Sequence, residues 1–207
     1  YAFDDDRRPV LDSLGEMVIT KPMPSMPVFF WNDPGKKKYH SSYFEDIPGV
    51  WRHGDWVRIT HDGGIVIYGR SDATLNRQGI RIGTAEIYRV LNEIPEIEDG
   101  LIVNLELEGG RHYMPLFVKL RNGMVLDKEL ISAIAKALKS KCSPRHVPDE
   151  VIQVTDIPYT ISGKKMEAPV KKILMGMEAD SALNKDAMRN PESLQFFKLF
   201  KVPQDEG

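Results

Sequence analysis

The stretch GRSDATLNRQGIRIG, residues 69–83, separates two parts of the chain that differ in their predicted secondary structure. Before it, short alternating runs interrupted by prolines and glycines predict strands and turns. After it, runs with helical spacing alternate with strand-like runs. The stretch holds three glycines and three arginines and few residues that could build a core. It therefore predicts a boundary between two units of an α+β fold.

The first part, residues 1–71, is expected to be rich in β-strands. Residues 15–20 alternate like a strand, and residues 56–60 and 65–68 predict a hairpin around the turn at residues 61–64. Residues 21–27 contain three prolines, which excludes a regular helix or a central strand there. Because the strand at 15–20 follows no helix or leader of its own, we expect a fragment whose sheet begins upstream. A processed mature start is the alternative.

The second part, residues 72–178, is expected to be a small mixed-sheet domain with helices. Thr84 is a candidate N-cap for a helix that Pro95 ends. The alternating runs 101–107 and 114–120 predict a hairpin around Gly109 and Gly110, with their apolar residues on two different faces.

Further along, Asp127 is expected to cap a helix that carries Leu130, Ile131, Ile134 and Leu138. Residues 151–155 predict another strand, and a helix should follow with Pro169 at its first position. Residues 179–207 are expected to form a tail, with its phenylalanines docked on another part of the chain.

Composition excludes several classes of function. The chain has 207 residues with 28 Lys and Arg against 30 Asp and Glu, a formal net charge of −2, which argues against nucleic acid as a partner and against a polybasic membrane anchor. No apolar run is long enough for a membrane span. The single cysteine, Cys142, excludes an internal disulfide, and the five histidines lack the spacing of a metal site, so none is expected. A cytoplasmic protein is the expectation.

Three segments could carry chemistry. Asp55 stands at the mouth of a strand, where its two oxygens could accept both hydroxyls of a ribose, although on spacing alone an Asx-turn is favoured. The arginines of residues 69–83 suit phosphate and ribose oxygens and its glycines suit close ligand approach, although a solvated linker has comparable weight. Lys164 follows Gly163 in a turn, and a flexible lysine could reach a developing negative charge. Each signal is weak alone.

Together and in this order, these segments resemble the C-terminal part of the adenylate-forming enzymes, the family that includes the acyl-CoA synthetases. The resemblance covers nearly the whole chain and rests on four matched runs: Gly54-Asp55, residues 69–72, residues 78–87, and Ser162-Gly163-Lys164. It implies that residues 1–71 are the β-rich end, the remnant of a β subdomain, of a large adenylation domain. Residues 72–178 would be its mobile C-terminal lid.

Within the family, the chain resembles the ligases that act on acetoacetate. This narrower resemblance rests on residues 24–33, 69–76, 145–148 and 157–160 and on the tail run 190–194. The acetyl- and propionyl-CoA synthetases are the alternative, but they generally carry an arginine-rich run after the catalytic lysine, where this chain has Lys-Met-Glu-Ala-Pro at residues 165–169.

The resemblance implies a two-step reaction and a role for particular residues. A short carboxylate or β-keto acid attacks ATP to give an acyl-adenylate, and CoA then displaces AMP. The resemblance implies that Lys164 is catalytic and that Asp72 is a hinge. It implies nucleotide binding by Asp55, Arg70 and Arg81. CoA would be bound by Lys139 and by Gly79, which would line the pantetheine tunnel. Mg²⁺ would accompany ATP, with no ligands identifiable in this chain. Lys164 and Gly79 would be used in turn, on two faces of one lid.

Departures from the family pattern qualify this expectation. The phosphate loop and the carboxylate pocket of the family normally lie upstream and are not in these residues, so the chain alone should be inactive and its upstream N-terminal domain is an expected partner. His53 stands where many relatives have threonine, next to Gly54 and Asp55. Two non-enzyme alternatives stay open: a standalone nucleotide- or CoA-binding module, and an α+β scaffold with an interaction tail.

Overall fold

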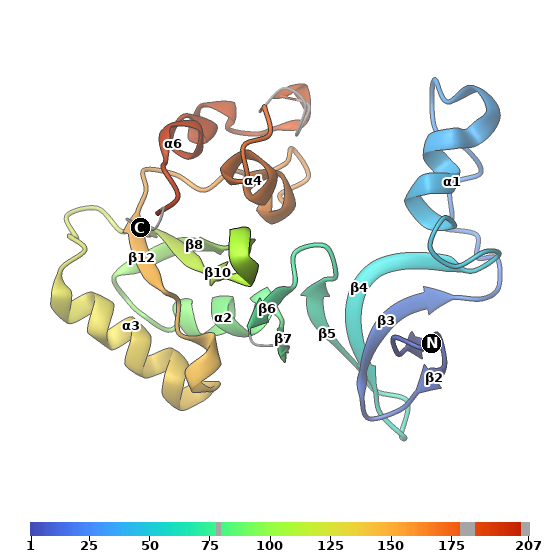
Figure 1. Cartoon of the computed structure of the whole chain (residues 1–207), viewed down its shortest axis with the longest axis horizontal. Helices are drawn as coiled ribbons and strands as arrows, with labels where there is room; N and C mark the ends of the chain where they lie inside the picture. Colours follow the sequence, from blue (N-terminus) through green and yellow to red (C-terminus); the bar gives the residue numbers. More distant parts are fainter. Residues whose placement is uncertain (78–79, 179–184, 204–207) are drawn as a thin grey trace. The chain divides into compact units, whose positions relative to one another are not determined.

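The computed structural model describes residues 1–77, 80–178 and 185–203, which form two compact units, Tyr1–Asp72 and Ala73–Gly207. The chain has an α+β fold (Figure 1). No helix among the described residues is long and apolar enough to cross a membrane.

The first unit is built on a five-stranded antiparallel sheet with the strand order β2-β1-β3-β4-β5. Its elements are β1 (Ala2–Phe3), β2 (Pro9–Val10), β3 (Leu14–Ile19), the 3-10 turn Pro34–Lys36, α1 (Lys37–Tyr43), β4 (Trp51–Ile59) and β5 (Ile65–Arg70). The strand expected at 15–20 and the hairpin around residues 61–64 are confirmed, and Gly63 supplies the positive φ (85°) that the turn needs. Helix α1 was not expected from the sequence.

The second unit contains a three-stranded mixed sheet with the order β12-β11-β8. Strands β8 and β11 are antiparallel, and β12 runs parallel to β11. The strands of this unit are β6 (Leu75–Arg77), β7 (Ile80–Ile82), β8 (Ile97–Ile102), β9 (Leu105–Glu106), β10 (His112–Tyr113), β11 (Pro115–Leu120) and β12 (Glu150–Gln153). Strands β6 and β7, and β9 and β10, pair as two short antiparallel ribbons.

Helices cover both faces of this sheet (Figure 1). They are α2 (Thr84–Leu91), α3 (Lys128–Lys141), α4 (Glu167–Leu174) and α6 (Leu194–Leu199), with 3-10 turns at Glu108–Gly110, Pro144–His146, Lys185–Ala187 and Pro191–Ser193. Leu116 and Val118 of β11 face one core with α2 and α3, whereas Phe117 faces a second core with α4 and α6. Because side chains of a strand alternate between faces, one apolar strand serves both cores.

The hairpin expected at residues 101–120 is confirmed, with its two apolar sets on opposite faces: Leu101, Val103 and Leu105 lie in one core and Met114, Leu116 and Val118 in the other. The helix capped by Asp127 is also confirmed, since the Asp127 side chain accepts a hydrogen bond from the Leu130 backbone N–H at 2.8 Å. Of the apolar residues that the helix carries, Ile131 is exposed, whereas Leu130, Ile134 and Leu138 are buried.

Two helix starts differ from the sequence prediction. Gly83, rather than Thr84, is the N-cap of α2, and Thr84 is the first helical residue. Pro169 is the third residue of α4, not the first. Proline is tolerated there because the N–H groups of the first helical turn have no partner within the helix. Both errors are boundary shifts that leave the helices in place.

The end of the chain packs on the second unit itself. Leu194 and Phe197 of α6 are buried in the core that contains Phe117, and the rings of Phe117 and Phe197 meet edge to face with their centroids 4.9 Å apart. Residues of the expected tail therefore form part of this core.

Candidate functional site

Asp55 and Arg70 are directly opposite each other in the register of β4 and β5. A bulge follows at Trp56 and Val57, at the end of the hairpin away from its turn. Such bulges redirect side chains near the ends of paired strands. The hairpin that the sequence predicts thus brings together two residues expected to bind a nucleotide.

Arg70 is held by the Asp72 carboxylate and by a backbone carbonyl. Its Nε and Nη2 donate to the two oxygens of Asp72 at 3.2 and 3.3 Å, and its Nη1 lies 3.4 Å from the His53 carbonyl oxygen. Burial acts against the charged form, but the hydrogen bond to Asp72 and the charges of Asp72, Asp55 and Glu16 raise the pKa of Arg70. The guanidinium therefore stays charged, and the Asp72 carboxylate orients it.

Gly54 is required by this arrangement. Its φ is +85°, and a Cβ there would lie 3.0 Å from Nη2 of Arg70. Its N–H donates to the Glu16 carboxylate at 3.0 Å and its carbonyl accepts from the Ser71 N–H at 2.9 Å. Glycine is thus needed both for the backbone conformation and for the close approach of Arg70.

His53 connects Asp55 to the aromatic residues of the first unit. The Trp51 indole N–H donates to Nδ1 of His53 at 3.4 Å, and Nε2 of His53 lies 3.5 Å from the Asp55 carboxylate. Because an indole nitrogen can only donate, Nδ1 acts as the acceptor and the proton of neutral His53 sits on Nε2, facing Asp55. The histidine thus supplies a polar neighbour to Asp55.

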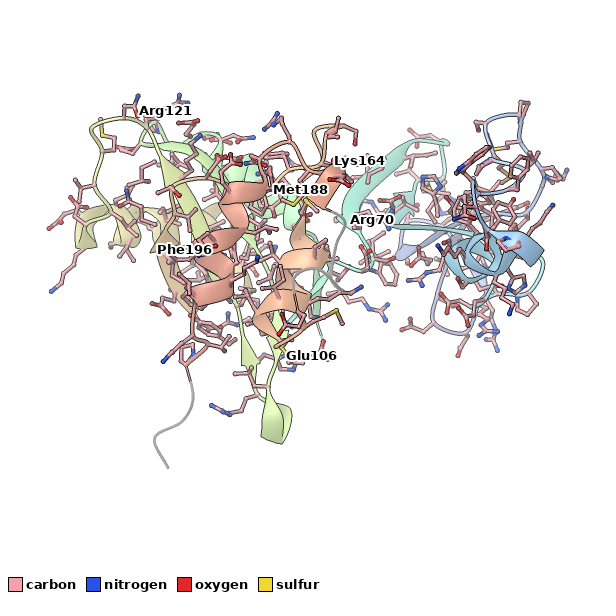
Figure 2. The ribbon with its side chains drawn as sticks, turned by 90° about the horizontal axis from the view of Figure 1, so that it is seen from above. Arg70, Glu106, Arg121, Lys164, Met188 and Phe196 are labelled. Carbon is pink, nitrogen blue, oxygen red and sulfur yellow. The ribbon has the colours of Figure 1, made fainter. Side chains whose placement is uncertain are left out.

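Lys164 lies in a tight turn in the second unit (Figure 2). The Gly163 N–H donates to the Thr160 carbonyl at 2.9 Å, Gly163 has a φ of +79°, and the Thr160 hydroxyl accepts from the Lys164 N–H at 3.0 Å. The Lys164 side chain is exposed. The turn, residues 159–165, is called the lysine loop below.

The end of the chain supports the lysine loop. The Ile161 N–H donates to the Ala187 carbonyl, Thr160 forms a bridge with Met188, and the Tyr159 N–H donates to Oδ1 of Asn190 at 2.9 Å. Asn190 is itself buried. These backbone contacts fix the loop from one side, and nothing in the sequence pattern indicated them.

The remaining candidates are distributed over the second unit. Arg81 is exposed on β7, opposite Asn76 in register. Lys139 is exposed on α3 and lines a pocket of about 580 Å³ together with Arg77, Lys136 and Pro148. Arg77 is held there by Asp149 at 2.6 Å. Gly79 lies outside the described residues. Among the described residues, no group of three or more His, Cys, Asp or Glu side chains could hold a metal ion.

No family model matches the chain. The acetoacetyl-coenzyme A synthetase of Rhizobium meliloti is 45% identical over 94% of this chain, and the acetoacetyl-CoA synthetase of Caenorhabditis elegans is 47% identical over 92%. The solved structure of acetoacetyl-CoA synthetase from Streptomyces lividans covers 95% of this chain with 47% identity and a TM-score of 0.89.

The chain is similar to the C-terminal part of the acetoacetyl-CoA synthetases. It spans 29% of the length of the Rhizobium relative and 29% of the Streptomyces chain. A solved anthranilate CoA ligase, AuaEII, in complex with anthranoyl-AMP shares the fold with a TM-score of 0.69 at 20% identity. The resemblance expected from the sequence, to the C-terminal part of acetoacetyl-CoA synthetases, is thus confirmed.

Proposed function

We propose that this chain is the part of an ATP-dependent, AMP-forming acyl-CoA ligase that completes the nucleotide site and supplies the catalytic lysine. The acid would be acetoacetate, which the names of the similar synthetases support over acetate or propionate. ATP, with its Mg²⁺, and CoA would be the other substrates. An N-terminal domain of the same polypeptide would be the partner, and the cytoplasm would be the compartment.

The observation that carries this proposal is the pairing of Asp55 with Arg70 on adjacent strands. A carboxylate accepts from two vicinal hydroxyls, and a charged guanidinium placed opposite it can donate to ribose oxygen. Asp55 would hold the ribose of ATP and Arg70 would assist there, with Asp72 orienting Arg70. This geometry supports the interpretation that Asp55 binds a nucleotide over the interpretation that it only forms an Asx-turn.

Lys164 would act in the first half-reaction. The acid carboxylate attacks the α-phosphorus of ATP, forms an acyl–phosphate bond and releases pyrophosphate. The ammonium of Lys164 would offset the negative charge that accumulates where the two anions meet. Its exposed position on a turn held by backbone hydrogen bonds supports this role.

The second half-reaction would use other residues of the same unit. The CoA thiol attacks the acyl carbonyl, loses its proton, forms the thioester and releases AMP. Gly79 would line the path of the pantetheine arm, Arg81 would contact the phosphate of the nucleotide, and Lys139 would contact a CoA phosphate. Asp72, the last residue of the first unit, would be the hinge that allows Lys164 and Gly79 to act in turn.

A substrate panel on the full-length protein tests the proposal. Acetoacetate, acetate and butyrate are compared by the rate of AMP formation with ATP and CoA. Acetoacetate should give the highest kcat/KM. A preference for acetate would instead identify the protein as an acetyl-CoA synthetase. If no acid gives AMP, the proposed ligase activity is wrong.

A further inference from the structure

The lysine after Lys164 is engaged in a different way. Nζ of Lys165 donates to Oδ1 of Asp99 at 2.5 Å and to the Gly100 carbonyl at 2.6 Å. It also lies 4.0 Å from the centre of the Tyr88 ring. Lys165 is thus largely buried, whereas the neighbouring Lys164 side chain is exposed.

Asp99 contacts both arms of the lysine loop. Tyr159 and Lys165 are paired across the turn, and the Tyr159 hydroxyl donates to Oδ2 of Asp99 at 2.7 Å. One carboxylate on β8 therefore binds the residue that enters the turn and the residue that leaves it. Burial and the neighbouring Asp99 raise the pKa of Tyr159, so its hydroxyl keeps the proton that it donates.

The contacts continue into two helices. The Tyr88 hydroxyl of α2 donates to the Glu167 carboxylate of α4 at 3.0 Å and accepts from the Ile102 N–H at 3.3 Å. Lys165 thus sits between β8 and Tyr88 of α2, and Tyr88 in turn contacts the helix that follows the loop. Its side chain is only 20% exposed and that of Asp99 only 21%. A charge pair in such surroundings is screened less than one on the surface.

We propose that Asp99, Tyr159 and Lys165, here called the Asp99 cluster, are positioning residues that set the geometry of Lys164 for adenylation. This inference rests on the proposed function of Lys164. None of the three residues needs to touch substrate. They fix both arms of the turn, so that the exposed ammonium is delivered to one position. A misplacement of about 1 Å can cost on the order of 100-fold in rate.

The test uses the full-length enzyme and measures the two half-reactions separately. Adenylation is followed by ATP–pyrophosphate exchange, and thioester formation by supplying acyl-adenylate and CoA. Lys165→Met should lower kcat of adenylation by roughly 10- to 100-fold, by the same misplacement argument, with KM for ATP changed less than about twofold. Thioester formation should stay at the wild-type rate, and Lys165→Arg should recover most of the adenylation rate, because arginine also pairs with a carboxylate and lies over aromatic rings.

Two further variants keep the proposal testable if Lys165→Met does not fold. Tyr159→Phe keeps the ring and removes one hydrogen bond to Asp99, and Asp99→Asn keeps the size of the side chain while removing its charge. Each should lower adenylation several-fold and spare thioester formation. Lys171→Met, which breaks a pair with Glu106 at 3.5 Å, is the matched control and should leave both half-reactions unchanged.

Lys164→Ala, measured in parallel, separates the two proposals. If Lys164→Ala keeps adenylation, the proposed role of Lys164 is wrong. If Lys164→Ala loses adenylation while the Lys165, Asp99 and Tyr159 variants keep wild-type kcat, or lose both half-reactions equally, only the positioning role is overturned.

Discussion

Asp55 and Arg70 occupy opposite positions on two paired strands, and the missing side chain of Gly54 leaves the space into which the Arg70 guanidinium fits. This relationship converts an ordinary β-hairpin into a place where a carboxylate and a guanidinium can meet one ligand. It also makes separate predictions for Asp55 and for Gly54.

Asp55→Asn should weaken ATP binding by the full-length enzyme. The amide keeps one acceptor but places a donor where the second hydroxyl would donate. Losing a hydrogen bond to a charged group costs about 1.5–3 kcal/mol, or roughly a 10- to 100-fold rise in KM for ATP. Steady-state kinetics at saturating acid and CoA measure this KM, with the exposed Asp6→Asn as control. An unchanged KM for ATP would contradict the proposed role of Asp55 in nucleotide binding.

Gly54→Ala should have two effects, which Gly63→Ala separates. Both glycines have a φ of +85°, but a Cβ at Gly63 meets nothing within 4 Å. Each variant should lose about 1–2 kcal/mol of unfolding free energy in urea, because alanine is strained in this conformation. Only Gly54→Ala should also raise KM for ATP, since it displaces Arg70. Equal kinetics for the two variants would contradict the account of Gly54.

The elements that the sequence predicts correctly are those with a local cause. Asp127 caps its helix through a bond only three residues away, and the hairpin at residues 61–64 follows from its turn residues. The proximity of Asp55 and Arg70 is also predictable from the sequence, because the two strands of a hairpin place facing residues next to each other. The turn at Lys164 could be predicted from Gly163 alone, because glycine favours the positive φ that the turn contains.

The features that sequence reasoning missed depend on distant contacts. Asp99 lies 66 residues before Lys165 along the chain, and no periodicity connects them. The support of the lysine loop by residues 187–190 is equally non-local. The parallel pairing of β12 with β11 also requires a crossover through α3, which only the folded sheet reveals.

Phe197→Ala should destabilise the second unit. Phe197 is 1% exposed and packs on Phe117, so its truncation leaves a cavity and should cost roughly 3–5 kcal/mol. Leu199→Ala on the same helix removes a side chain that is 71% exposed and should stay within about 0.5 kcal/mol of wild type. Urea unfolding followed by circular dichroism compares the two. Equal losses would show that α6 does not pack as described.

Cys142 should react slowly with thiol reagents in the native protein. Burial, together with the charge of Glu86, raises the pKa of its thiol. A raised pKa leaves less thiolate at a given pH, and the thiolate is the reactive form. The rate with a disulfide reagent at pH 8 should therefore rise strongly when urea unfolds the chain. A native rate equal to the unfolded rate would contradict this burial.

The central claim is that Lys164 serves adenylation alone, and the two half-reactions of the full-length Lys164→Ala variant test it most directly. ATP–pyrophosphate exchange should be abolished, whereas thioester formation from supplied acyl-adenylate should proceed at the wild-type rate. Gly79→Leu should give the reverse pattern, and the exposed Lys172→Ala should affect neither. If Lys164→Ala and Gly79→Leu impair the same half-reaction, the account of Lys164 is wrong.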